Sequence, residues 1–238
     1  MSDEKSLKYN EPWILQRADP YVYRHTDGSY YFTASVPAYD GIVLRRAGSL
    51  AELSGAEEVM VWKKHESGPM SYHIWAPEIH YLFGKWYIYF AGGEKEDIWK
   101  IRPYVLECSG DDPLTDEWVE LGKMKRAAED EFSFEAFSLD ATVFENKGEY
   151  YYVWAEKVGV GKMISNLYIA KMESGNQLKT VQILLTTPDY DWERKGFWVN
   201  EGPAVIHHDG KLFLTYSASE TGVDYCVGML SLIHISEP

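Results

Sequence analysis

The sequence predicts an all-β protein. Three observations support this: the chain repeats one plan four times, each copy centres on a glycine, and the run after that glycine is apolar at consecutive positions. A parallel α/β protein would need long segments with a helical apolar period between its strands. The chain lacks such segments, and only residues 49–58 suggest a short helical turn.

The four copies share a short polar or Pro-marked entry, an apolar run, a glycine turn and an aromatic second run. They are ADPYVYRHTDGSYYFTAS from Ala18, WAPEIHYLFGKWYIYFAGG from Trp75, LDATVFENKGEYYYVWAEK from Leu139 and NEGPAVIHHDGKLFLTYSAS from Asn200. A tight hairpin turn needs a positive φ, which glycine adopts without strain. Each copy is therefore predicted to begin with a β-hairpin, with its turn at Gly28, Gly84, Gly148 or Gly210.

The second runs indicate how the sheets pack. Residues 30–32, 86–90 and 150–154 are apolar at consecutive positions, whereas a strand with one solvated face would alternate. Sheets stacked face to face around an axis cover both faces of such strands, and about 60 residues per repeat suits a four-stranded blade. The sequence therefore predicts a β-propeller as one domain over residues 1–238, with blades that begin near residues 18, 75, 139 and 200.

The charge limits the partners. The chain has 37 acidic and 23 basic residues and a formal net charge of -14, which repels phosphate backbones and anionic lipid headgroups. We therefore expect neither nucleic acid nor membrane as a partner. The polar first ten residues do not resemble a signal peptide, and the two cysteines lie far apart. We expect free thiols and a cytoplasmic location, with a secreted mature enzyme as the alternative.

Three carboxylates occupy matched positions in three of the four repeats. Counted back from the turn glycine, Asp19 lies nine residues away, Asp140 eight and Glu201 nine. The second repeat has Ala76 at this place, and its carboxylate, Glu78, lies two residues further on. Equivalent positions on the inner strands of a propeller converge on one end of the central channel. We therefore expect the first three side chains to face one another.

A single acidic residue at the start of a strand more often forms a turn than a catalytic site. Three at matched offsets favour a catalytic cluster. Because clustered like charges disfavour ionisation, at least one of these carboxyl groups is expected to keep its proton to a higher pH. Glycoside hydrolysis requires such a pairing of a general acid with a general base.

The same residues carry a resemblance to a known family. The stretches ADPYVY around Asp19, SLDATVF around Asp140 and NEGPAV around Glu201 resemble the three catalytic signatures of glycoside hydrolase family 43, and WAPEI from Trp75 resembles its second-blade motif. Wider stretches of the first two repeats are similar to the exo-acting α-L-arabinofuranosidases of that family. The similarity extends over about residues 10–230.

The resemblance implies a five-bladed propeller that acts as an inverting hydrolase. Its substrate would be the terminal α-L-arabinofuranosyl residue of 1,5-linked arabino-oligosaccharides. Asp19 would be the general base and Glu201 the general acid, while Asp140 would raise the pKa of Glu201 and orient it. We expect no cofactor, with a calcium ion in the channel as the alternative. A β-xylosidase, an endo-arabinanase, a carbohydrate-binding propeller without activity and a purely structural repeat protein remain open.

Five further side chains are candidates for the pocket. Trp75 and Trp198 offer flat apolar faces that stack on sugar rings, and packing between blades is the alternative. His73 and His65 are expected to line the pocket, although a lone histidine more often has a structural role. Asn200 is expected to hold a sugar hydroxyl or to shape the turn that follows it.

The chain departs from the family pattern at its end. The family's ring has five blades, whereas this chain has about four, of which the last is short. The sequence SLIHISEP, residues 231–238, does not resemble the continuation expected there. We therefore expect the closing blade to be missing and residues 231–238 to form a tail outside the family pattern.

Overall fold

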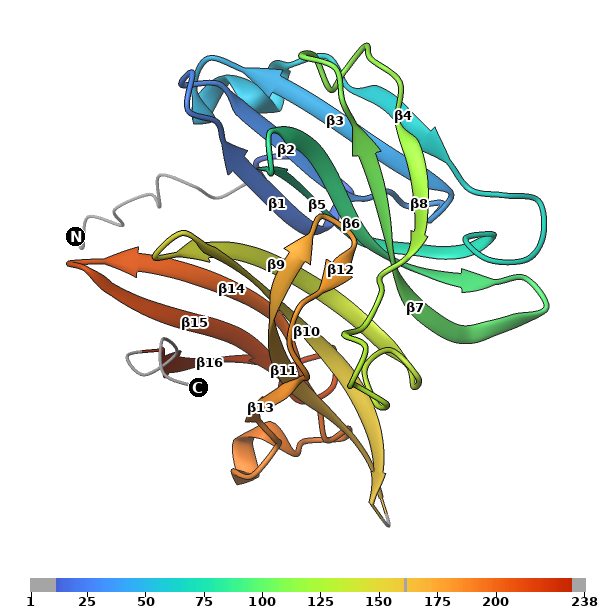
Figure 1. Cartoon of the computed structure of the whole chain (residues 1–238), viewed down its shortest axis with the longest axis vertical. Helices are drawn as coiled ribbons and strands as arrows, with labels where there is room; N and C mark the ends of the chain where they lie inside the picture. The colour runs from blue at the N-terminus through green and yellow to red at the C-terminus, as the bar shows by residue number, and fades with distance from the viewer. Residues whose placement is uncertain (1–11, 161, 233–238) are drawn as a thin grey trace, which may run out of the picture.

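The computed structural model describes residues 12–160 and 162–232. They form four antiparallel sheets and two short 3-10 helices, which confirms the all-β prediction (Figure 1). The predictions for the first ten residues and for most of the tail lie outside the described residues. No described helix has the length and apolar character needed to span a membrane. Both cysteines are free thiols, as predicted.

The first two sheets have four strands each, in chain order. The first consists of β1 (Ala18–Arg24), β2 (Tyr30–Ser35), β3 (Gly41–Ala47) and β4 (Val59–Lys63). The second consists of β5 (Tyr72–Leu82), β6 (Lys85–Glu94), β7 (Asp97–Cys108) and β8 (Val119–Lys123). The helical turn expected within residues 49–58 is the 3-10 helix η1 (Leu50–Gly55), between β3 and β4.

The third and fourth sheets follow the same plan. The third has the order β9 (Ser138–Asn146), β10 (Glu149–Val160), β11 (Lys162–Ser174) and β12 (Gln177–Leu178), and β13 (Ile183–Thr186) also pairs with β11. The 3-10 helix η2 (Asp191–Glu193) leads into the fourth sheet. This sheet has three strands, β14 (Asn200–His208), β15 (Lys211–Ala218) and β16 (Cys226–Ser231).

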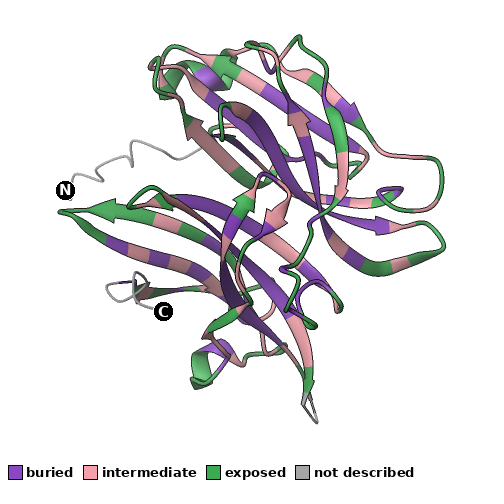
Figure 2. Cartoon of the chain, viewed as in Figure 1, coloured by how far each residue is buried: buried purple, intermediate pink, exposed green. Residues whose placement is uncertain are grey.

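The predicted hairpins are confirmed. In each sheet the first two strands pair antiparallel. The glycines between them all have positive φ: 92° at Gly28, 76° at Gly84, 80° at Gly148 and 70° at Gly210. Every residue of β6 except its two ends is buried, as its unbroken apolar run predicts. Buried residues likewise concentrate on β6 and β10, and the outer strands are more exposed (Figure 2).

The sheets stack around a common axis with the first strand of each innermost. β1 packs against β5, β5 against β9, and β9 against β14. Apolar clusters fill the spaces between consecutive sheets; for example, Tyr89 and Trp154 belong to one cluster, and Val153 and Leu214 to another. Within the described residues, no packing of similar extent joins the first sheet to the fourth. The result is a four-blade propeller arrangement whose inner strands begin at one end.

Candidate active site

One pocket collects residues from all four sheets. Its volume is about 370 Å³, a size typical of sites for small ligands. Its lining comprises Asp19, Pro20 and Tyr21 from the first sheet, Ala76 and Glu78 from the second, Asp140 and Ala141 from the third, Gly202, Pro203, Ala204 and Ser217 from the fourth, and Tyr225 from the connection between β15 and β16. Two of the three predicted catalytic carboxylates line this pocket. The third, Glu201, directly precedes the lining Gly202.

Each inner strand reaches the pocket through a bulge. The strand pairing shifts register near the start of β1, β5, β9 and β14, and one residue inside each shift has a left-handed backbone. These residues are Asp19 (φ 49°), Ala76 (φ 45°), Asp140 (φ 50°) and Gly202 (φ 57°). A left-handed backbone costs energy for a residue other than glycine and recurs at functional sites. Bulges of this kind re-aim side chains.

The bulges correct one expectation from the sequence. Asp19 and Asp140 are structural equivalents, but the equivalent residue of the fourth sheet is Gly202, and Glu201 lies one position before it. Counting back from the turn glycine suggested a match because the first copy has nine positions between its left-handed residue, Asp19, and its turn glycine, whereas the other copies have eight. Glu201 therefore approaches the other carboxylates from a different strand position.

Asp19 is held by a hydroxyl from the neighbouring strand. Ser35 Oγ donates a hydrogen bond to Asp19 Oδ2 at 2.7 Å. The same Oγ accepts one from the backbone N–H of Ala76 at 2.8 Å. Since the N–H of the second sheet occupies the acceptor side of the hydroxyl, the single proton of Ser35 points to Asp19. Asp19 itself is exposed to the pocket.

Asp140 is bound to the fourth sheet. Its Oδ2 accepts a hydrogen bond from the backbone N–H of Gly202 at 3.1 Å. Burial raises the pKa of Asp140 well above its ordinary value, and the negative charges of Glu201 and Asp19 raise it further. The charges of Glu201 and Asp19 thus both act on Asp140.

Burial is also the main reason that the pKa of Glu201 is raised, and the charge of Asp19 adds to it. Two groups act in the opposite direction: the hydroxyl of Tyr225 donates to Glu201 Oε1 at 3.0 Å, and Lys157 contributes a positive charge. Two coupled carboxyl groups with raised pKa values titrate as a pair. Asp140 and Glu201 therefore retain a proton between them to a higher pH than isolated carboxyl groups do.

A fourth carboxyl group, Glu78, lines the pocket from the second sheet. Its Oε2 lies 2.9 Å from His80 Nε2, and Nδ1 of this fully buried histidine lies 3.4 Å from the hydroxyl of Tyr21. Burial raises the pKa of Glu78. In the sequence, Glu78 stands out only as an exception to the carboxylate pattern. The alternation of Glu78 and His80, which places both side chains on one face of β5, was the signal that could have found the pair.

Two predicted ligand residues, Trp75 and His73, lie together at the start of β5. Their ring centroids are 4.2 Å apart, and the exposed ring of Trp99 lies 5.3 Å from His73. Trp75 directly precedes Ala76 of the pocket lining, but neither Trp75 nor His73 is itself a lining residue. Burial lowers the pKa of His73, which favours a neutral ring.

The other predicted ligand residues do not line the pocket either. Asn200 is fully buried, and its Nδ2 donates to Glu193 Oε1 at 3.2 Å and to Thr186 Oγ1 at 3.4 Å. This placement supports the alternative that Asn200 shapes the chain before Glu201. His65 binds Glu120 at 2.9 Å. The ring of Trp198 is half-buried under the guanidinium of Arg194, at 4.6 Å.

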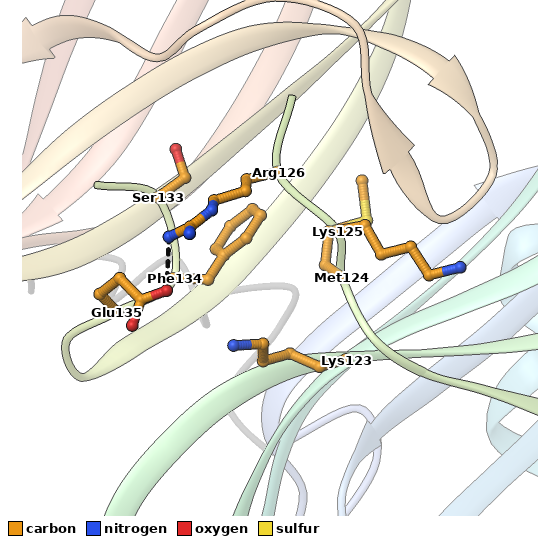
Figure 3. Close-up of a pocket in the computed structure, with 7 residues that line it drawn as sticks. All are labelled: Lys123, Met124, Lys125, Arg126, Ser133, Phe134 and Glu135. Atoms are coloured by element: carbon orange, nitrogen blue, oxygen red, sulfur yellow. Dashed lines mark hydrogen bonds and ion pairs between the residues drawn. The ribbon is translucent and has the colours of Figure 1, made fainter. Parts of the chain in front are cut away.

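A second pocket, of about 290 Å³, has a different character (Figure 3). Its lining residues are Lys123, Met124, Lys125, Arg126, Ser133, Phe134 and Glu135. The one carboxylate among them, that of Glu135, is paired with Arg126 at 2.5 Å. A hydrolytic site needs both an acid and a base, so this pocket does not meet the requirement.

The described residues contain no group of three or more His, Cys, Asp or Glu side chains placed to hold a metal ion.

Two curated proteins are similar to this chain over most of its length. The extracellular exo-alpha-(1->5)-L-arabinofuranosidase of Streptomyces chartreusis is 48% identical over 94% of this chain and 66% of its own length. Alpha-L-arabinofuranosidase 43 of Humicola insolens is 45% identical over 95% of this chain and 46% of its own length. The chain thus spans about half to two thirds of the length of these curated relatives.

The solved structures agree on the fold. The crystal structure of alpha-L-arabinofuranosidase from Lactobacillus brevis superposes with a TM-score of 0.83 at 51% identity, over 93% of this chain and 69% of that one. The family model described as glycosyl hydrolases family 43 matches residues 9–238. On these grounds, and on the carboxylate pocket at the centre of its propeller, the chain belongs to glycoside hydrolase family 43.

Proposed function

We propose that this chain is the catalytic propeller of an inverting exo-α-L-arabinofuranosidase, which releases terminal arabinofuranosyl residues from α-1,5-linked arabino-oligosaccharides. The observation that carries the proposal is the pocket that Asp19 and Asp140 line and that Glu201 adjoins, where the charges of these groups raise one another's pKa values. The names of the two relatives and of the Lactobacillus brevis enzyme support arabinofuranosides as the substrate class.

Asp19 is proposed as the general base. Ser35 fixes one of its oxygens, Oδ2, and Oδ1 is left for a water molecule. In an inverting reaction this water lies between the base and the anomeric carbon, on the face opposite the leaving group. The base takes one proton from the water as the oxygen of the water bonds to the anomeric carbon.

Glu201 is proposed as the general acid. Its raised pKa keeps it protonated at a pH at which an ordinary glutamate is ionised. Its proton passes to the glycosidic oxygen as the bond from that oxygen to the anomeric carbon breaks. Asp140 assists because a negative charge beside Glu201 disfavours the ionised acid.

The proposal also covers the cellular location of the protein. The Streptomyces chartreusis relative is extracellular by name, and we propose an extracellular location for this protein as well. The cytoplasmic location expected from the sequence has no support from this relative.

The decisive test is product analysis. Arabinotriose, linear arabinan and xylobiose are incubated with the protein, and the products and their first-formed anomers are followed by NMR. The proposal requires arabinose as the only early product from the arabinose substrates, released as the β-anomer. Larger early products from arabinan would indicate an endo-acting enzyme, and cleavage of xylobiose alone a xylosidase. Calorimetric binding of arabinotriose without any cleavage would indicate a binding module.

A further inference from the structure

Among the described residues, only Tyr225 makes a hydrogen bond to the carboxyl group of Glu201. It lies in the connection between β15 and β16 and lines the pocket. Its hydroxyl is 3.0 Å from Glu201 Oε1. Ser217, another lining residue, also interacts with the side chain of Tyr225 and lowers the pKa of its phenol. The general acid is thus held by a phenol that is itself held by the adjacent strand.

The direction of this hydrogen bond is fixed. Burial and the negative charge of Glu201 raise the pKa of Tyr225, so the phenol keeps its proton. It donates that proton to Oε1, and Oε1 is then a poor position for the acidic proton. The other oxygen, Oε2, has no hydrogen bond to a described residue and is left to carry it.

We propose that Tyr225 is a positioning residue for the general acid: it engages Oε1 so that Glu201 presents its proton on Oε2. The inference rests on the proposed function, because it assigns the acid role to Glu201. A hydrogen bond to a carboxylate stabilises the ionised form. Tyr225 therefore also opposes the factors that raise the pKa of Glu201, and it limits how high that pKa rises.

Other charged groups near Glu201 also influence its ionisation. Asp19 disfavours its ionisation from the first sheet. The charge of Glu201 in turn raises the pKa of Asp140 in the third sheet, on which Glu78 acts as a more distant negative charge. Lys157 on β10 favours ionisation, and its Nζ lies 3.9 Å from the ring centroid of Phe137. None of these groups is altered when the Tyr225 hydroxyl is removed, so a change in the titration of Glu201 can be assigned to the phenol.

The test is the Tyr225→Phe variant, with Tyr81→Phe as the matched control. The exposed fractions of the two residues are 40% and 38%, and Tyr81 lies next to the turn at Gly84, at the end of β5 away from the pocket. The profile of kcat/KM against pH is measured for both variants and for the unaltered chain. Because the acid must be protonated, activity falls as the pH rises through the pKa of Glu201.

Without the phenol the pKa of Glu201 rises. The alkaline limb of Tyr225→Phe should therefore move to higher pH by about half a unit or more, while kcat falls about tenfold because Oε1 is no longer fixed. Tyr81→Phe should leave both unchanged. An alkaline limb that stays in place, or moves to lower pH, overturns the inference while the arabinofuranosidase function stands. Absence of cleavage by the unaltered chain overturns both.

If Tyr225→Phe does not fold, Ser217→Ala supplies the second test. It keeps the phenol and removes its other partner. A smaller shift of the alkaline limb in the same direction supports the inference, and an unchanged limb overturns it.

Discussion

Ser35 and Asp19 form a hydrogen bond of 2.7 Å in which the serine hydroxyl is the donor, and the donor's own orientation is set by the backbone of the second sheet. The proposed base is therefore positioned by two blades at once. A comparable link holds Asp140, which accepts from the backbone of the fourth sheet. The pocket geometry thus depends on how adjacent blades pack, and this dependence leads to testable predictions.

Replacing Ser35 with alanine should reduce kcat about tenfold with a smaller change in KM, because one hydrogen bond to a charged group is lost. It should also lower the free energy of unfolding by about 1–3 kcal/mol, since the N–H of Ala76 loses its acceptor. Steady-state kinetics and urea unfolding measure the two effects. Ser54→Ala, at an exposed serine of η1, is the control. An unchanged kcat in Ser35→Ala would show that the hydroxyl does not position the base.

Asp19→Asn and Glu201→Gln should each reduce kcat by about 10²–10⁴-fold, the usual contribution of a general base or acid. Both replacements keep the size of the side chain, so the far-ultraviolet circular dichroism should not change. Turnover of an arabinofuranoside is the measurement. Near-normal turnover in either variant would show that its carboxyl group is neither the acid nor the base.

A leaving group that needs no proton gives a control for the acid. Glu201→Gln should lose much less activity on an aryl arabinofuranoside with an acidic phenol than on arabinotriose, whereas Asp19→Asn should lose activity on both. Equal losses in the two variants on both substrates would contradict the assigned roles.

Much of this architecture was predictable from the sequence because its cause is local. The glycine turns require a positive φ, and the unbroken apolar run of β6 follows from burial on both faces. The pocket was predictable in part, since inner strands converge in any propeller. The bulges were not predictable from the sequence, because a register shift arises from pairing between strands. Counting residues therefore matched Glu201 with Asp19, although its equivalent is Ala18.

The contacts that support the carboxylates also could not be predicted from the sequence. Ser35, Ser217 and Tyr225 belong to no motif of their own, and each meets its partner only after two or three strands have paired. Asn200 shows the opposite error: its place beside Glu201 suggested a sugar ligand, but the chain turns its side chain into the core. Proximity in sequence does not fix the direction of a side chain at a bulge.

Asp140→Asn should move the alkaline limb of kcat/KM to lower pH, the opposite of Tyr225→Phe. The negative charge of Asp140 and that of Glu201 repel each other, so removing one allows the other to ionise more easily. A pH profile of the variant measures the shift. A limb displaced to higher pH would contradict the coupling of the two carboxyl groups.

The same variant should be more stable than the unaltered chain at pH 7. Asp140 has a raised pKa in the folded state, so its ionisation opposes folding as the pH rises above the ordinary aspartate value of about 3.9. The gain of Asp140→Asn, about 1 kcal/mol or more, should therefore disappear below that pH. Thermal unfolding from pH 3 to pH 8 tests this. Asp209→Asn is the control, since Asp209 is exposed and has a similar φ of 48°.

Asn200→Ala should act on stability and not on sugar binding. Asn200 Nδ2 donates to the buried carboxylate of Glu193, which also accepts from the backbone of Asp189 and Tyr190 and from the hydroxyl of Tyr216. Losing one donor to a buried carboxylate should lower the free energy of unfolding by about 1–3 kcal/mol. KM for arabinotriose should stay unchanged at a temperature at which the variant is folded.

The control for this variant is Asn146→Ala, at the opposite end of the third sheet's inner strand. Asn146 makes no hydrogen bond through its side chain among the described residues, so its replacement should change neither stability nor KM. If Asn200→Ala instead raised KM severalfold without loss of stability, the side chain would have to turn out of the core to bind the sugar. The two outcomes differ in both measurements, because a buried amide that supports Glu193 cannot also contact a ligand.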